Sequence, residues 1–589
     1  MDAERIRDTK KSATSSVWCV LVPIVVAIFV YANSLTNPLI YDDESVILKN
    51  YNIRTWENFR HLFDKEYFVR FQELSYRPLP SFTYLLDYST WGASEDGTPR
   101  AFRFHLTNVL VHASVGAIVF LFVISIVPRR SVATLAALVY VVHPVLTEVT
   151  NIAGFREDSL CALFFFLTLI LFNQFFRSRF SALRYALSLT AFFFALLSKE
   201  TAIVLPVVLV LQDAMFSDRP FNWKQRILPY AGLGAVLTFY IIVRFVLMKH
   251  PVEMKIPYAA GSLVNTIYTM PTVLVIYARL LFFPIHLSAL YDLPPIVSPA
   301  DVRFLLSVAI MLALVLYALL NIRKRSVVSF GILWFFITLA PVSNLVGIGN
   351  LMAERFLTVP LIGFCLLVGV WLHTASECGG VRKVLGIVVT GVFVVSLATL
   401  TITRNTTWGN ERLVWRQTAI CNPESGRAWD AVAQQYIRVD VAPEHKDWKR
   451  VERLTTQAIE FNTRLNRQDS NPYYHRGMAR RHLGRLYEAE RDLVIILPGD
   501  QNHPRAVLQL GAIYHQQRRL SEAKKKYEEA ATLIPHSADP WRGLAHVARM
   551  ERNKKAELQA LMEAAKRMPT DSPLLPGIRK RISQLQGQL

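Results

Sequence analysis

Charged residues are scarce in this chain of 589 residues: Asp, Glu, Lys and Arg make up 19%, against 52% hydrophobic residues. A soluble protein of this size carries about 25% charged residues. The mean hydropathy is +0.27, and the apolar residues form long blocks between Val17 and Ile402. This composition excludes a soluble enzyme and a disordered chain. It predicts an all-α, polytopic membrane protein with a soluble tail.

Cysteine is also scarce, since the chain has 5 and none of them forms a CxxC pair. So few cysteines exclude a secreted disulfide scaffold, and their spacing predicts no zinc or redox site. Acidic residues are fewer than basic ones, 45 against 65, which gives a net charge of +20. Part of this excess is what the cytoplasmic loops of a polytopic protein carry, so it predicts no nucleic-acid partner. No metal site and no bound cofactor are expected.

The apolar blocks predict a helical bundle of eleven membrane spans, because a spanning helix needs about 20 apolar residues. The expected spans are residues 17–34, 104–127, 132–148, 158–176, 183–198, 201–216, 227–248, 302–321, 327–343, 355–373 and 384–402. The first is a retained anchor behind a cytoplasmic stretch, 1–16, since more spans follow and no small-residue cleavage site is present. The membrane domain is thus 17–402, with a large first loop at 35–103. A linker at 403–424 and a repeat domain at 425–589 follow.

The segment 263–287 is apolar but contains Pro271, Arg279, Pro284 and His286. Basic residues mark the cytoplasmic side of membrane proteins. The later basic loops, such as Arg323–Arg325, are cytoplasmic only if 263–287 does not cross. We therefore expect a re-entrant or in-plane segment, although a crossing would place the tail on the opposite side. Without a crossing, the first loop, the segments 143–157, 198–200, 249–301 and 341–354, and the tail all share the non-cytoplasmic side.

The tail repeats itself every 34 residues. Gly477, Gly511 and Ala545 are spaced at this interval, as are Ala489 and Ala523, and Pro535 and Pro569. A degenerate earlier copy begins near Trp429. Small residues where two antiparallel helices cross, with proline at the turn, are typical of tetratricopeptide repeats. Such repeats form a solenoid with a concave surface that binds protein, so a protein partner is expected here.

Polar residues that are unusual in a membrane protein gather on the predicted non-cytoplasmic side. Asp42 and Asp43 lie in a run of acids after the first span, and either a general base or a helix N-cap explains them. The others are Arg77, His143, Glu148, Arg156, Asp158, Lys199, Glu200, Glu354 and Arg355. Taken singly, each has a structural explanation as a cap, an ion pair or a snorkelling side chain. Together on one side they suit an enzyme whose basic groups hold a lipid-linked phosphate while a carboxylate deprotonates an acceptor.

Taken in order, these motifs resemble the transmembrane and tetratricopeptide-repeat-containing O-mannosyltransferases. The matching stretches are Tyr41-Asp42-Asp43, Tyr76-Arg77-Pro78-Leu79, Phe104-His105-Leu106-Thr107-Asn108, His143-Pro144-Val145-Leu146-Thr147-Glu148, Arg156 to Asp158, Ser198-Lys199-Glu200, Pro341-Val342-Ser343-Asn344, Ala353-Glu354-Arg355-Phe356, and Arg404-Asn405 to Trp408. One departure is Phe155, where that family more often has glycine. The repeat array is also shorter than in animal members.

The resemblance implies a GT-C-type glycosyltransferase related to the protein O-mannosyltransferases. Its substrates would be a dolichyl- or polyprenyl-phosphate sugar, by resemblance dolichyl-phosphate mannose, and Ser or Thr hydroxyls of a protein acceptor held by the repeats. Asp43 is the expected base with Asp42 beside it, although either can serve. Arg77, Arg156, Lys199 and Arg355 are the expected phosphate ligands. The site would face the lumen of the endoplasmic reticulum, or the periplasm in a bacterium. A transporter and a non-catalytic membrane scaffold are the alternatives.

Overall fold

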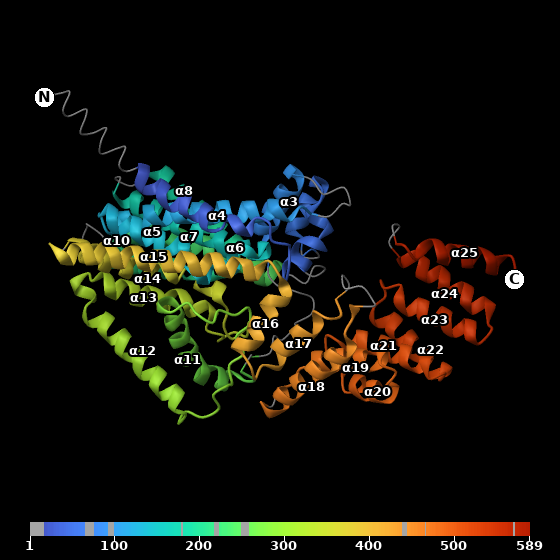
Figure 1. Cartoon of the computed structure of the whole chain (residues 1–589). Helices are drawn as coiled ribbons and strands as arrows, with labels where there is room; N and C mark the ends of the chain where they lie inside the picture. The colour runs from blue at the N-terminus through green and yellow to red at the C-terminus, as the bar shows by residue number, and fades with distance from the viewer. Residues whose placement is uncertain are drawn as a thin grey trace. The chain divides into compact units, whose positions relative to one another are not determined.

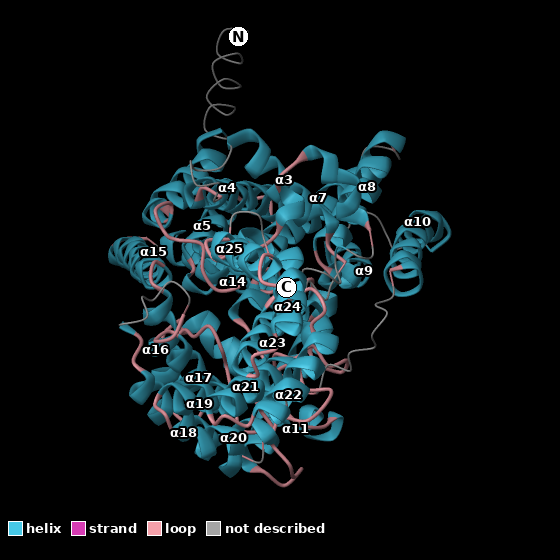
Figure 2. Cartoon of the chain, turned by 90° about the vertical axis from the view of Figure 1, so that its right-hand side faces the viewer, coloured by secondary structure: helices cyan, strands magenta, loops and turns pink. Residues whose placement is uncertain are grey.

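The computed structural model describes residues 17–64, 67, 76–91, 99–177, 181–216, 223–248, 258, 260–377, 379–438, 445–465, 467–568 and 572–589. Within these ranges every regular element is a helix, which confirms the all-α prediction (Figure 2). The chain divides into two compact units, Met1–Val414 and Trp415–Leu589 (Figure 1). Two residues used in the sequence analysis lie outside the described ranges: Cys378, one of the five cysteines, and Pro569 of the predicted repeat pattern.

Seven helices of the first unit are long and apolar enough to cross a membrane. They are Val17–Ser34, Ala101–Ile126, Ala153–Arg177, Lys224–Leu247, Leu263–Phe282, Val302–Leu320 and Val381–Trp408. The helix α5 (Arg130–Val142) and the segment Pro144–Asn151 form an eighth candidate, bent by 52°. Pro144 accounts for the bend because proline cannot continue the helical hydrogen-bond ladder. The first unit is therefore a multi-pass membrane bundle.

Several predicted spans are helices shorter than the length usually needed to cross a membrane. The helices α8 (Ala182–Ser198) and α14 (Leu361–Glu377) and the segment Val327–Val342, which begins with α13, are apolar but shorter than a full span. The predicted span 201–216 consists of the 3-10 turn η7 (Glu200–Val204) followed by α9 (Leu205–Phe216). The remaining described α-helices of this unit are α3 (Pro78–Trp91), α4 (Ala101–Ile126), α6 (Thr147–Asn151), α7 (Arg156–Arg177), α10 (Trp223–Ile242), α11 (Leu263–Phe282), α12 (Val302–Leu320) and α15 (Val381–Trp408). The division between the two units falls within α16 (Glu411–Cys421). The predicted linker 403–424 is thus largely helical.

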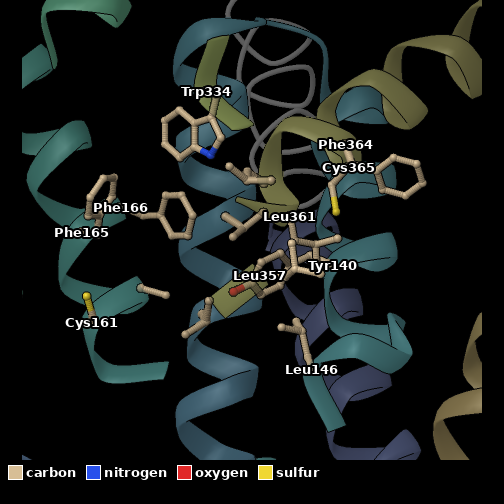
Figure 3. Packing of buried hydrophobic residues seen from close by; sticks show 14 of the residues in the cluster. Tyr140, Leu146, Cys161, Phe165, Phe166, Trp334, Leu357, Leu361, Phe364 and Cys365 are labelled. Carbon is tan, nitrogen blue, oxygen red and sulfur yellow. The ribbon is translucent and has the colours of Figure 1, made fainter. Parts of the chain in front are cut away.

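Aromatic rings fill the centre of the bundle. Trp334 of α13 is fully buried and stacks on Phe166 of α7, with ring centroids 6.0 Å apart. Figure 3 shows Phe165 and Phe166 facing this indole. The indole N–H donates to the Val359 carbonyl at 3.0 Å, so its polar atom is satisfied inside the core. The core thereby fixes α7 against α13 and against the segment that leads into α14.

A network of four asparagine side chains joins the first and last spans. The Asn405 amide donates to Asn33 Oδ1 at 2.9 Å, and the Asn151 amide donates to Asn405 Oδ1 at 2.8 Å. Asn37 in turn donates to Asn151 Oδ1 at 2.9 Å. Because a polar group in lipid must find a partner inside the protein, these bonds hold Val17–Ser34, α6 and α15 together at one end of the bundle. Asn405 belongs to a glycosylation sequon, but it is fully buried.

The helix α11 is one continuous helix. The segments before and after it both contact residues of the polar turns at Glu200 and Glu354. Arg244, just beyond α10, lies 3.6 Å from Glu200, and the loop before α12 donates a backbone N–H from Ser288 to Glu354. In Figure 1, α11 and α12 are inclined to α15. By length and composition α11 also qualifies as a span. Its re-entrant or in-plane placement stays a prediction.

The second unit consists of helix pairs, as the 34-residue period predicts. The pairs are α17 (Gly426–Gln434) with α18 (Trp448–Arg464), α19 (Asn471–His482) with α20 (Leu486–Val494), α21 (His503–Gln516) with α22 (Leu520–Leu533), and α23 (Asp539–Met550) with α24 (Lys554–Arg567), followed by α25 (Leu575–Gln586). A Cβ atom at Gly511 would lie 2.8 Å from the Tyr527 ring, and one at Gly477 would lie 2.8 Å from Leu493. The repeated small residues therefore mark the helix crossings, which is the feature on which the repeat prediction depends.

Candidate active site

The polar residues singled out in the sequence converge at one end of the membrane bundle, which we call the polar end. Four segments meet there: residues 40–48 after the first span, the start of α7, the turn between α8 and η7, and the 3-10 turn η11 (Glu354–Leu357). Ion pairs and hydrogen bonds join these segments to one another or to Arg77 and Glu148, over more than a hundred positions of the chain. The polar end is therefore a single constellation and not a set of separate helix caps.

Asp43 is completely buried and holds two segments together. Its Oδ1 accepts the Gly154 N–H at 2.6 Å, and its Oδ2 accepts the Ile40 N–H at 3.3 Å. Burial raises the pKa of Asp43 to about 7, although the backbone donors oppose this shift. A carboxylate whose two oxygens bind backbone groups inside the protein fixes the loop geometry, and it has no free oxygen directed to a substrate.

Asp42 is the more accessible of the two adjacent acids. It is half-buried, and among the described residues no hydrogen bond or ion pair engages its carboxylate. Burial raises the pKa of Asp42 to about 6, while the positive charge of Arg355 opposes the shift and Glu148 adds to it. Asp42 is therefore a free carboxylate beside a guanidinium, with a pKa that suits a base working near neutral pH.

Arg355 is held rigidly but keeps part of its guanidinium free. Its Nη1 donates to Glu148 Oε1 at 2.6 Å, and its backbone N–H donates to the other carboxylate oxygen at 2.9 Å. The guanidinium carbon lies 4.3 Å from the centroid of the Phe155 ring. Within the described chain, Nε and Nη2 have no hydrogen-bond partner. Two adjacent N–H donors with this fork geometry match the oxygens of a phosphate.

The Phe155 ring supports the guanidinium of Arg355. Its ring lies under Arg355, and Tyr41 packs against it edge-to-face with ring centroids 5.9 Å apart. A cation over an aromatic face is stabilised by about 0.5–2 kcal/mol. The departure from glycine at this position thus supplies a platform for Arg355, next to the Asp42–Asp43 turn.

A pocket opens beside Arg355. Its lining mixes apolar side chains with charged and hydroxyl groups, among them Asp158, Thr201 and Arg355. The lining residues are Asp158, Cys161, Phe165, Thr201, Val204, Thr338, Val342, Arg355, Phe356, Thr358, Val359 and Pro360. A charged head next to an apolar wall is the chemistry of a lipid-linked phosphate.

The other cations of the polar end are occupied by carboxylates. Arg77 binds Glu200 through Nε and Nη2, at 3.0 and 2.7 Å, and also contacts Glu157. Lys199 Nζ lies 2.6 Å from Asp158 and 3.1 Å from Glu157. Burial disfavours the charge of Lys199, but the two carboxylates outweigh burial and raise its pKa. This network fixes the turn between α8 and η7 next to the pocket.

The pKa of Glu200 reflects the same network. Burial acts to raise it, but Arg77 and then Arg244 outweigh burial and hold it well below its usual range. Glu200 is therefore a permanent anion whose role is to orient Arg77. The motif Ser198-Lys199-Glu200 thus contributes one cation, Lys199, and one anion, Glu200, to the ion-pair network.

Arg156, one of the expected phosphate ligands, is not among the residues that line the pocket. It is fully buried, and its three nitrogens bind Asn108 at 2.6 Å, Asp87 at 2.6 Å and Thr83 at 3.0 Å. These bonds tie the start of α7 to α3 and α4. With no free donor, Arg156 supports the fold around the site. Asp87, its counter-ion, was missed in the sequence, where a single acid within the apolar helix α3 was the available signal.

His143 and Glu354 are also fixed by structural bonds. The His143 ring bonds to the Leu281 carbonyl at 3.1 Å and accepts the Val145 N–H at 3.4 Å. Glu354 accepts the Tyr291 hydroxyl at 2.7 Å and the Ser288 N–H. Burial raises the pKa of Glu354 to about 7. These two residues shape the floor of the polar end, and neither lines the pocket.

Comparison with known proteins gives relatives of one kind. The chain is 24% identical to protein O-mannosyl-transferase TMTC3 of Homo sapiens over 86% of its length and 59% of the relative's length. It is 24% identical to human TMTC4 over 69% of its length and 62% of the relative's length. The chain thus spans less than two thirds of the curated relatives it matches. No family model matches it.

Among solved structures, the chain is similar to the oligosaccharyltransferase of Archaeoglobus fulgidus in its apo form. The TM-score is 0.40 at 10% sequence identity, over 74% of this chain and 59% of that one. The sequence comparison confirms the resemblance that the nine motifs predicted: the curated homologues of this chain are protein O-mannosyl-transferases.

Proposed function

We propose, from this homology to protein O-mannosyl-transferases, that the chain is a membrane glycosyltransferase that glycosylates the Ser or Thr hydroxyls of a protein. The donor is a dolichyl- or polyprenyl-phosphate sugar, and the relatives' name favours mannose. One observation carries the proposal: the carboxylate of Asp42, which no described residue binds, feels the charge of Arg355, and Arg355 lines a pocket with both apolar and polar walls.

In the proposed reaction, Asp42 takes the proton of the acceptor hydroxyl as its oxygen attacks the anomeric carbon of the sugar. The new carbon–oxygen bond forms as the bond from that carbon to the phosphate oxygen breaks. The bonding electron pair leaves on the polyprenyl phosphate, and the configuration of the anomeric carbon inverts. Arg355 stabilises the charge that develops on the phosphate.

The geometry favours Asp42 as the base and Asp43 as its support, the reverse of the order that we expect from the sequence. Both oxygens of Asp43 bind backbone N–H groups, whereas the carboxylate of Asp42 is free. Among the expected phosphate ligands, Arg355 is favoured because Arg77 and Lys199 are already bound to carboxylates. Arg77 and Lys199 would influence the electrostatic potential in the pocket indirectly, through the carboxylates that they bind.

We also propose that the polar end faces the lumen of the endoplasmic reticulum, or the periplasm in a bacterium. The basic residues of the connection between α12 and α13, Arg323 to Arg325, lie at the other end of these helices and mark the cytoplasmic side. The last span ends next to Asn33 and Asn37, at the polar end. The repeats would therefore lie on the side of the membrane where acceptor proteins are found.

The test is transfer of radiolabelled mannose from dolichyl-phosphate mannose to Ser/Thr-bearing extracellular domains, in membranes that contain the chain. Asp42→Asn should lower transfer about a hundredfold or more, because it removes the base. The matched control is Glu44→Gln, since Glu44 is an exposed neighbouring acid paired with Lys49. Transfer that survives in Asp42→Asn would refute this base. Failure of the parent to transfer from either a mannose- or a glucose-linked donor would refute the enzyme and leave the scaffold.

Asp43→Asn separates the two acids. An amide at this position places its NH₂ group against a backbone N–H, so one buried donor loses its acceptor. We expect a loss of about 1–3 kcal/mol in the free energy of unfolding. A lower midpoint of thermal unfolding in Asp43→Asn but not in Asp42→Asn would agree with this assignment. The opposite pattern would contradict it.

A further inference from the structure

The first helices of three successive repeats carry basic side chains that the rest of the second unit does not neutralise. Arg481 of α19, Arg505 and His515 of α21, and His546 of α23 form this group, which we call the arginine–histidine face. Arg481 and His515 are separated by one repeat of 34 residues, so they occupy equivalent positions in α19 and α21. The rings of His515 and His546 lie 6.2 Å apart, which links α21 to α23.

Two other arginines of α19, Arg476 and Arg480, are paired with acidic residues. Arg476 binds both oxygens of Asp492, at 2.9 and 2.7 Å, and Arg480 binds Glu452 and Asp492. These two side chains face the second helices of the repeats. The solenoid therefore supplies carboxylates wherever an arginine stabilises the packing of its helices.

Within the described residues, no carboxylate forms a hydrogen bond or ion pair with the side chains of the arginine–histidine face, although Glu557 acts on His546 through its charge. Arg481 is half-buried, its Nε is buried without a partner, and its Nη2 contacts only the ring of His482. Burial lowers the pKa of Arg481, the shift expected where no anion compensates the charge. The Nε2 of His515 is also buried without a partner. Glu557, which acts on His546, is itself bound by Arg549 and Arg581.

A partly buried cation without a counter-ion costs free energy, so its retention points to an anionic ligand. Arginine binds carboxylates through two parallel hydrogen bonds. Imidazole N–H groups can donate to backbone carbonyls in the same ligand. An extended peptide with acidic side chains supplies both kinds of acceptor, and helical-repeat proteins present extended surfaces for binding.

We propose that the arginine–histidine face binds an extended, acidic segment of the acceptor protein. The proposal rests on the proposed function only in identifying the bound segment as part of the acceptor. Binding itself is independent of sugar transfer. The repeats would thus select acceptors by carboxylates within the segment that they bind.

The experiment measures fluorescence anisotropy of a labelled, Ser/Thr-bearing peptide with several Asp residues, added to the full chain in detergent without donor. A second peptide has Asn in place of each Asp. We expect the acidic peptide to bind about tenfold more tightly or better, because its carboxylates form charge-assisted hydrogen bonds with arginine that the neutral amides do not. Arg481→Gln and Arg505→Gln should each weaken its binding several-fold.

The matched control is Arg491→Gln, which removes the same charge from an exposed position on α20. It should bind the acidic peptide like the parent, and all three variants should unfold at the parent's temperature. Equal binding of the two peptides would overturn the proposal. So would an equal loss in Arg491→Gln, because it would show a general attraction to a basic protein. Tight binding without sugar transfer would leave this face intact and refute only the enzyme.

Discussion

Two adjacent carboxylates at the polar end differ in what surrounds them. Asp43 is enclosed by the backbone of the turn at Gly154, whereas Asp42 is half-exposed next to Arg355. The sequence shows that both acids are present, but their neighbours come from segments more than a hundred residues away. For this reason the acidic motif could be found from the sequence, while the assignment of roles within it could not.

The pH dependence of transfer should identify the base. A base must be ionised, so activity is lost as the pH falls through its pKa. With Asp42 as the base, we expect kcat/KM to rise with pH and to reach half its maximum near pH 6, because the pKa of Asp42 is raised to about 6. If Asp43 were the base, the midpoint would lie near 7. Glu44→Gln should leave the profile unchanged, and a profile that is flat between these values would contradict both assignments.

Phe155 allows a test of how Arg355 is positioned. Phe155→Leu retains an apolar side chain but removes the ring under the guanidinium. We expect the KM for the lipid donor to rise about fivefold with a smaller change in kcat, since a cation–π contact contributes about 0.5–2 kcal/mol. Phe155→Tyr should restore the parent's KM. A Leu variant that behaves like the parent would show that the ring serves packing alone.

At the scale of the helix, the sequence predicted which helices exist and their order along the chain better than it predicted the residues at which they begin and end. The strongly apolar spans, such as 104–127 and 302–321, were found close to their observed bounds because nothing interrupts them. The span 132–148 is bent at Pro144, and 201–216 begins as a 3-10 turn because Lys199 and Glu200 are held by ion pairs. Where polar side chains at the site fix the backbone, hydropathy no longer locates the start of a helix.

Close contact between α13 and α14 depends on two glycines. A Cβ atom at Gly363 would lie 2.7 Å from the Gly331 carbonyl oxygen, so the helices would have to separate. We expect Gly363→Ala to lower the free energy of unfolding by about 1–3 kcal/mol. Thermal unfolding in detergent, followed by tryptophan fluorescence, measures this. Gly391→Ala is the control, because a Cβ atom there would meet nothing within 4 Å. Equal stability of the two variants would contradict the packing argument.

At the scale of the whole molecule, the repeat unit was the part most fully predicted. Its period of 34 residues is visible in Gly477, Gly511 and Ala545, and each helix pair depends mainly on its neighbours. The membrane unit lacks such a period. Its long-range ties, such as Arg77 to Glu200 and Arg355 to Glu148, join distant segments and could be observed only in the structure.

The sidedness of the membrane unit can be measured with inserted glycosylation sequons. A flexible linker with a sequon after Val297, in the exposed loop before α12, should be glycosylated in a eukaryotic host. The same linker after Lys324, between α12 and α13, should remain unmodified. Asn405 should carry no glycan, because it is fully buried among other asparagines. Glycosidase-sensitive shifts on a gel report each site. The reverse pattern would place the polar end in the cytoplasm.

The asparagine network also bears on how the chain is made. Asn33 enters the membrane early in synthesis, but its amide partner Asn405 follows 372 residues later. Until then, the first helix has neither its final neighbour nor a complete set of hydrogen bonds, and unsatisfied amides in lipid are costly. We therefore expect the nascent first helix to depend on insertion factors, and a product that ends before Asn405 to be recognised by membrane quality control and degraded. Insertion of the last span would therefore be the step that completes the hydrogen bonds of the first helix and protects the chain from degradation.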